Sequence, residues 1–109
     1  MQVMMPSPIE AYFEADMSED PQALLRAFAP DAVVKDEGET HAGRDAIEAW
    51  WRAAKVQYQP VVEPLDLEER DDTVRVRSQV TGNFPGSPVM LTFTFRLAGD
   101  RIAELEIAP

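Results

Sequence analysis

The hydrophobic and polar positions of this chain follow two different periods, which meet near Pro60. Before Pro60 the apolar residues recur at three- and four-residue spacing, and after it they alternate with polar residues. Spacing near 3.6 indicates helices, and spacing of two indicates strands. The pattern therefore predicts three helices with one strand among them, followed by four consecutive strands.

Two helices are expected before the first strand, and a third is expected over Arg44–Tyr58. The second helix follows Asp20-Pro21 and includes Phe28 before it stops ahead of Pro30, because a residue before proline disfavours helical geometry. The first helix places apolar side chains on one face. Those side chains are Ile9, Tyr12, Phe13 and Met17.

The first strand carries an acidic residue on its apolar side. Alternation places Asp36 beside Val34 and opposite Lys35. Lys35 and Glu37 are costly to bury unpaired, so their side is expected to face water. Asp36 is then directed inward, where it needs a partner or takes a raised pKa. We expect either a general base or a structural acid bonded to the next turn or to Arg44.

The second half of the chain reads as a meander of strands. A proline breaks the first of them, which is therefore expected at an edge of the sheet. The expected strands are Val61–Glu69, Thr73–Phe84, Val89–Leu97 and Arg101–Ile107, with a shorter pairing segment at Glu39–Ala42. Helices followed by such strands predict an α+β fold, with three helices packed on one face of a mostly antiparallel sheet.

Composition narrows the classes of function. The 109 residues suit one domain, expected to span residues 1–109 with residues 1–6 as a loose N-terminal tail. A net charge of −10 argues against nucleic acid and against anionic membrane surfaces. The absence of cysteine excludes thiolate chemistry and is compatible with a cytoplasmic location. No signal peptide is apparent, and no apolar run approaches the ~18 residues of a membrane helix.

The order of these elements resembles the nuclear transport factor 2-like superfamily, a cystatin-like cone of strongly curved sheet closed by three helices. Within it the chain looks most like the SnoaL-like branch, which includes polyketide cyclases and ketosteroid isomerases. The resemblance covers nearly the whole chain. It rests on Tyr12-Phe13, Phe28–Val33, Asp36, Gly43–Ile47, Trp50-Trp51 and the last hairpin around Gly99.

The resemblance implies an apolar cavity, no cofactor and often a homodimer formed through the sheet. Asp36 matches the family acid that moves a proton next to a carbonyl, and Tyr12 matches the tyrosine that hydrogen-bonds to the enolate oxygen. Phe93 stands where the isomerases have a protonated aspartic acid. Losing one such donor costs ~3–4 kcal/mol of transition-state stabilisation, which argues against steroid-type isomerisation.

Other candidates would line the pocket. Trp50 and Trp51 point about 100° apart on a helix, so one is expected in the core and the other at the cavity or an interface. Phe28 and Phe93 are expected in the core or the cavity wall. His41 is expected in an exposed loop, with the alternative of an acid or base at the cavity mouth. One histidine and scattered carboxylates predict no metal site.

The sequence thus leads to two hypotheses. The first is a SnoaL-like pocket protein, of unassigned activity, in which Asp36 and Tyr12 carry out proton transfer on a small apolar carbonyl compound. Isomerisation, cyclisation or dehydration would each fit that hypothesis. The alternative is a non-catalytic ligand-binding or dimerisation module, which the absence of the third acid favours.

Overall fold

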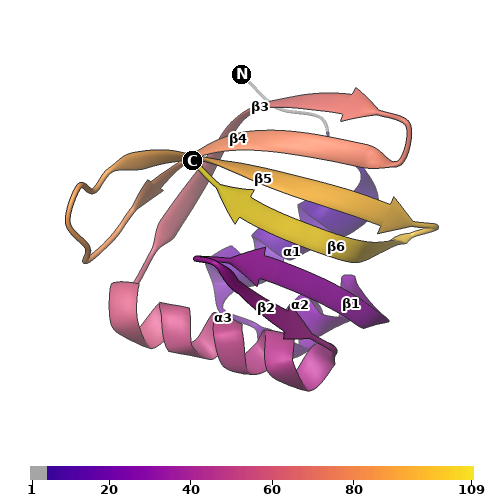
Figure 1. Cartoon of the computed structure of the whole chain (residues 1–109), viewed down its shortest axis with the longest axis horizontal. Helices are drawn as coiled ribbons and strands as arrows, with labels where there is room; N and C mark the ends of the chain where they lie inside the picture. Colours follow the sequence, from indigo (N-terminus) through magenta and orange to yellow (C-terminus); the bar gives the residue numbers. More distant parts are fainter. Residues whose placement is uncertain (1–4) are drawn as a thin grey trace.

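The computed structural model describes residues 5–109, which form three helices and six strands (Figure 1). The expected tail at residues 1–6 falls mostly on residues 1–4, outside the described part; Met5 packs against the core. The elements are α1 (Ser7–Ser18), α2 (Pro21–Arg26), β1 (Phe28–Asp36), β2 (Glu39–Ala42), α3 (Arg44–Tyr58), β3 (Val61–Arg70), β4 (Thr73–Thr81), β5 (Val89–Ala98) and β6 (Arg101–Ala108). The α+β prediction and the order of elements are confirmed.

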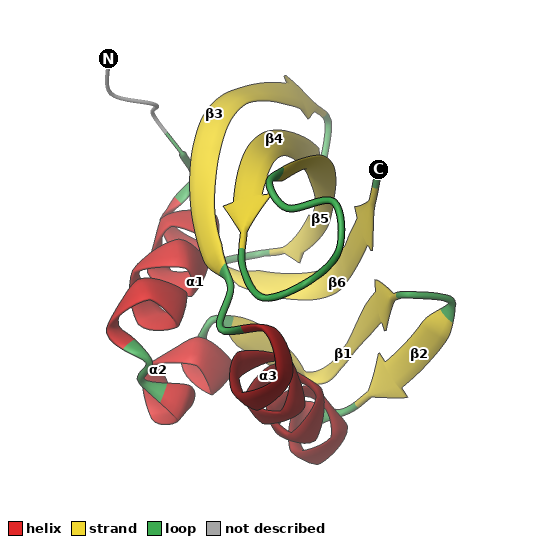
Figure 2. Cartoon of the chain, turned by 90° about the vertical axis from the view of Figure 1, so that its left-hand side faces the viewer, coloured by secondary structure: helices red, strands yellow, loops and turns green. Residues whose placement is uncertain are grey.

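One curved sheet contains all six strands in the order β2-β1-β6-β5-β4-β3. β1 runs parallel to β6, and every other neighbouring pair is antiparallel. The sheet curls over the helices (Figure 2). β3 is an edge strand with a register shift between Pro64 and Asp66, as a proline in a strand requires. None of the helices within residues 5–109 is long and apolar enough to cross a membrane.

The helix boundaries follow from local chemistry. Asp20 accepts a hydrogen bond from the backbone N–H of Ala23 at 3.1 Å, and Pro21 occupies the first position of α2. α3 spans the predicted residues and ends at Gln59, which adopts a left-handed backbone ahead of Pro60. α3 places Ile47 and Trp51 in the core.

The core lies between the helices and the inner face of the sheet. The alternation predicted for β4 is confirmed, because Val74, Val76, Ser78 and Val80 are all buried. Three details of the prediction were wrong. The strand expected over Thr73–Phe84 ends at Thr81. Met17 is 77% exposed, and its neighbour Asp16 is buried instead. Phe28 begins β1 rather than ending α2, because it pairs with Ile102 of β6.

Candidate functional site

Asp36 lies at the end of β1 with its side chain directed inward. Ala32 and Val34, which share its side of the strand, are fully buried, and Asp36 itself is half-buried. The indole N–H of Trp50 donates a hydrogen bond of 3.0 Å to Asp36 Oδ2. Arg44, proposed from the sequence as a partner, instead donates to the backbone carbonyl of Phe28 at 2.7 Å. The inward orientation predicted from alternation is therefore present, with a partner that the sequence did not suggest.

The environment of Asp36 raises the pKa of its carboxyl group. Burial is the largest cause, because it disfavours the charged form, and the negative charge of Glu37 adds to it. Hydrogen bonds from Trp50 and from the backbone of Glu37, together with the charge of His41, oppose this rise. A carboxylate whose pKa is raised toward neutrality is a better proton acceptor, which is what a general base requires.

Trp50 and His41 form the wall next to this carboxylate. β2 pairs with β1 so that His41 lies opposite Val34, two residues from Asp36 along the strand. The rings of His41 and Trp50 are 6.1 Å apart between centroids and tilted by 36°. Both side chains are half-buried, so the rings are partly accessible from outside. The structure therefore brings Asp36, Trp50 and His41 together from three elements.

Tyr12 lies deeper, in a cluster of aromatic rings. Its ring makes edge contacts at 5.2 Å with Phe13, 5.9 Å with Phe28 and 5.5 Å with Phe95. Burial raises the pKa of the Tyr12 hydroxyl well above its usual value, and the charges of Asp16 and Asp36 raise it further. Tyr12 is therefore protonated at neutral pH, and the charge of Asp36 reaches it.

Phe93 occupies the same level of the sheet as Asp36. Asp36 pairs with Ile107 of β6, and Ile107 pairs with Phe93 of β5. Phe93 is buried, and its ring lies 5.7 Å from that of Phe13. The Phe93 ring is thus in register with Asp36, two strands away. A second acid at this position would have faced the same side of the sheet as Asp36.

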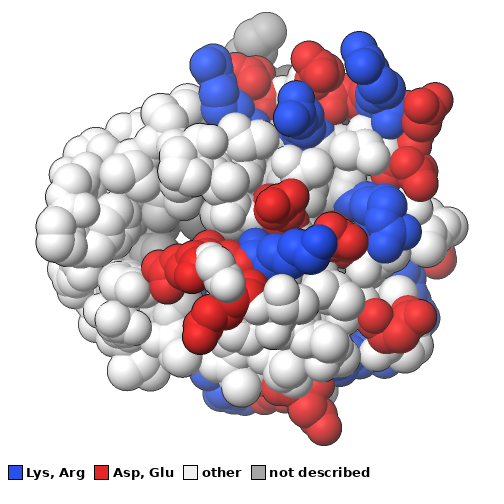
Figure 3. Space-filling model, viewed as in Figure 1, with Lys and Arg blue, Asp and Glu red and all other residues white. Residues whose placement is uncertain are grey.

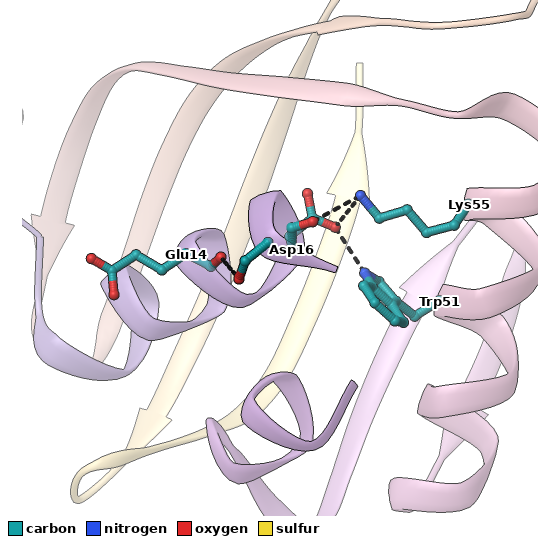
Figure 4. Close-up of polar contacts among 5 residues, drawn as sticks. Glu14, Asp16, Trp51 and Lys55 are labelled. Carbon is teal, nitrogen blue, oxygen red and sulfur yellow. Dashed lines mark hydrogen bonds and ion pairs between the residues drawn. The ribbon is translucent and has the colours of Figure 1, made fainter. Parts of the chain in front are cut away.

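Trp51 points away from Asp36, toward α1. Its indole N–H donates to Asp16 Oδ1 at 2.8 Å (Figure 4). The ammonium group of Lys55 contacts the same oxygen at 3.0 Å and the backbone carbonyl of Asp16 at 3.0 Å. These three residues form a buried polar link between α1 and α3 that sequence reasoning missed. Asp16 follows Tyr12 by four residues, and that spacing was the signal for its burial.

Glu37 and Tyr58 form the outer part of the site. The Tyr58 hydroxyl donates to Glu37 Oε1 at 3.3 Å, and its ring meets Phe84 of the β4–β5 connection edge-on at 5.9 Å. Figure 3 shows a recess between that connection and α3, with acidic side chains beside it. Hydrogen bonds and a ring contact join Asp36 to Trp50, Glu37 to Tyr58 and Tyr58 to Phe84, and we call this group of five side chains the mouth. The sequence prediction did not include Glu37, Tyr58 or Phe84 among the lining residues.

Two other hollows lie on the outer surface. One, of about 430 Å³, lies between α1 and α2, and the other, of about 620 Å³, lies between the ends of α1 and α3 and the start of β3. Neither is lined by Asp36, Tyr12 or Trp50. Within residues 5–109, no three histidine or acidic side chains are grouped as a metal site would require.

Comparison with known proteins identifies the family. The profile of the SnoaL-like domain matches residues 9–105. A protein from Sinorhizobium meliloti (SMa1630), solved as a provisional polyketide cyclase, is 50% identical, with 94% of each chain covered and a TM-score of 0.93. No curated protein matches the chain.

Two further solved structures share the fold. A Catenulispora acidiphila protein with a ketosteroid isomerase-like fold, solved with trimethylamine, is 22% identical over 97% of this chain and 87% of its own, with a TM-score of 0.83. A computationally designed 17-OHP binder is 18% identical over 95% of this chain and 90% of its own, with a TM-score of 0.80. The chain therefore belongs to the SnoaL-like domain family and has the nuclear transport factor 2-like fold.

Proposed function

We propose that this protein catalyses cofactor-free proton transfer on a small carbonyl compound bound in the mouth, with Asp36 as the base. The observation that carries the proposal is the half-buried Asp36 carboxylate, turned inward, with one oxygen on the Trp50 indole N–H at 3.0 Å. The 50% identical S. meliloti protein, with its provisional polyketide cyclase assignment, supports carbonyl chemistry of this kind.

In the proposed step, Asp36 takes one proton from the substrate and returns it, so no other reactant is needed. Asp36 removes a proton from the carbon next to the carbonyl, and the C–H electrons form the double bond of an enolate. The Tyr12 hydroxyl hydrogen-bonds to the enolate oxygen, and the protonated Asp36 returns the proton to a carbon of the same substrate. Trp50 holds the carboxylate in place, and Phe28 and Phe93 belong to the apolar wall. Isomerisation needs only this exchange, and cyclisation or dehydration begins with the same enolate.

The proposal is tested by hydrogen–deuterium exchange at carbon. A panel of small ketones and 1,3-dicarbonyl compounds is incubated with the protein in D₂O, and loss of the proton next to the carbonyl is followed by NMR. We expect Asp36→Asn to slow the exchange by about 100-fold or more, the usual contribution of a positioned base. Asp31→Asn is the matched control, because Asp31 is an exposed acid on the same strand. Exchange that is equal in all three proteins would exclude the proposed base.

The alternative function, a non-catalytic ligand-binding or dimerisation module, is favoured by a separate observation. The Tyr12 ring is enclosed by three phenylalanine rings. Phe93 lies in register with Asp36, where a second acid would have been able to donate a hydrogen bond to the enolate oxygen. Under this alternative the wild-type protein binds members of the panel without exchanging their protons. The same NMR experiment distinguishes the two functions, because binding and exchange are read from separate signals.

We also propose that the protein forms a homodimer through the outer face of its sheet. Across that face, Arg75 and Arg77 of β4 pair with Thr94 and Thr92 of β5, and Thr94 pairs with Glu106 of β6. Basic and acidic side chains thus flank a strip of short residues, and Figure 3 shows both signs mixed on this face. A two-fold axis along β5 would place each basic row over the partner's acidic row, so the face is self-complementary.

A further inference from the structure

The mouth combines negative charge with aromatic faces. Asp36 and Glu37 are consecutive, and each accepts a hydrogen bond from an aromatic residue of α3, Trp50 at 3.0 Å and Tyr58 at 3.3 Å. Glu37 has a left-handed backbone (φ 53°), so its side chain leaves the alternation of β1 and reaches α3. The indole and phenol rings therefore stand beside two carboxylates at one opening.

The two rings are separate surfaces along α3. Trp50 and Tyr58 are eight residues apart, which corresponds to about 12 Å along the helix axis at 1.5 Å per residue, so a small organic group contacts one ring at a time. Trp50 is hydrogen-bonded to Asp36, and the next residue along the chain after Asp36 is Glu37. A compact ligand against the Trp50 ring would therefore lie close to both acids.

The basic residues of the surrounding elements are engaged elsewhere. Lys35 of β1 pairs with Glu104 on the outer face at 3.3 Å. On α3, Arg44 bonds to the carbonyl of Phe28, Arg52 pairs with Glu48, and Lys55 pairs with Asp16. Residues 82–88, which border the mouth on the other side, contain no charged residue. Among residues 5–109, His41 is the basic group whose charge lowers the pKa of Asp36.

We infer that the ligand of the mouth carries a positive charge, as a protonated amine or a quaternary ammonium group. Two carboxylates attract such a group, and the Trp50 ring adds a cation–π contact. The net charge of −10 steers cations toward the protein in the same sense. The inference rests on the proposed function for the carbonyl part of the substrate, and it adds the charge of the substrate. The substrate is then an amino-carbonyl compound rather than a carboxylate-bearing or uncharged one.

Choline and its uncharged carbon isostere, 3,3-dimethyl-1-butanol, are suitable probes because they have the same shape. The chain has two tryptophans, Trp50 in the mouth and Trp51 in the link to α1, so ¹H–¹⁵N NMR shows two indole signals, assigned with Trp50→Phe. We expect choline to shift the Trp50 signal, to leave the Trp51 signal in place, and to bind at least about fivefold more tightly than the isostere.

The variant Glu37→Gln should weaken choline binding about threefold or more. Glu63→Gln is the matched control, because it removes one exposed acid from the edge strand β3 and leaves the mouth intact. Equal affinity for choline and the isostere, or equal weakening by both variants, would overturn the inference. Neither result touches the proposed function, which fails if no carbonyl compound of the panel exchanges its proton or if the exchange is independent of Asp36. Choline binding with no exchange of any ketone, amino-ketones included, would keep the inference and remove the catalysis.

Discussion

Replacing Lys55 by methionine tests how α1 and α3 are held together. The substitution keeps most of the apolar stem of the side chain and removes the ammonium group. It deletes the 3.0 Å ion pair to Asp16 Oδ1, the 3.0 Å hydrogen bond to the Asp16 carbonyl and the cation–π contact at 5.6 Å from the Trp51 ring. Asp16, which is 8% exposed, then keeps only the Trp51 indole as a side-chain partner.

The magnitude follows from the burial of the pair. Breaking a fully buried ion pair costs about 3–5 kcal/mol, and breaking an exposed one costs about 0–1 kcal/mol. The two side chains here are 15% and 11% exposed, so a value toward the buried end, about 2–4 kcal/mol, is expected. For a domain of this size about 1 kcal/mol corresponds to about 4 °C, so Tm should fall by roughly 8–16 °C.

Urea unfolding and calorimetry measure this loss. Arg52→Met is the matched control, because Arg52 pairs with Glu48 on the exposed side of the same helix and should cost less than about 0.5 kcal/mol. The double variant Asp16→Leu with Lys55→Met should recover part of the loss, since no unpaired charge stays buried, while the Trp51 indole N–H loses its acceptor. A loss below about 0.5 kcal/mol for Lys55→Met, equal to that of the control, would refute the buried link.

Three further predictions concern the site. Asp36→Asn should raise Tm at pH 7 and change it little at pH 4. The raised carboxyl pKa of Asp36 stabilises the wild-type fold at low pH, and this stability is lost as pH rises through the folded-state pKa. A larger gain at pH 4 than at pH 7 would contradict this. Trp50→Phe removes the bond that lowers the pKa of Asp36, so the pH dependence of proton exchange should move to higher pH, whereas an unmoved profile would deny Trp50 that role. Gly82→Ala should cost about 1–3 kcal/mol in urea unfolding, because the added methyl would lie 2.7 Å from the Tyr58 carbonyl and 2.9 Å from the Phe84 ring; an unchanged midpoint would show that the connection yields easily.

The fold could be predicted well because its signals are local. Period-two alternation placed Asp36 inward, and α3 was bounded correctly by Gly43 and Pro60. The start of β1 was wrong because a long-range contact decides it: Phe28 pairs with Ile102, 74 positions later in the chain. Single-sequence periodicity carries no information about such a partner.

The details of the site were harder to predict for a related reason. Asp36 and Glu37 accept hydrogen bonds from Trp50 and Tyr58, which lie on α3. Alternation predicts which side of a strand a residue faces, but it does not predict which side chain of another element will contact that residue. Met17 was chosen for the buried face of α1 by hydrophobicity, yet Asp16 is buried because Trp51 and Lys55 supply its partners. The helical spacing from Tyr12 indicated the buried face, but a search for apolar residues alone passes over a buried polar group whose partners come from another helix.

The parallel pairing of β1 with β6 has a consequence for how the protein is made. β1 is synthesised early, but one of its two neighbours in the sheet is the last strand of the chain. During translation Asp36 can meet β2 and α3 while the other side of its strand still lacks its neighbour, so the inner wall closes only when β6 has left the ribosome. A nascent chain stalled before Arg101 would therefore hold the acid without the pocket around it.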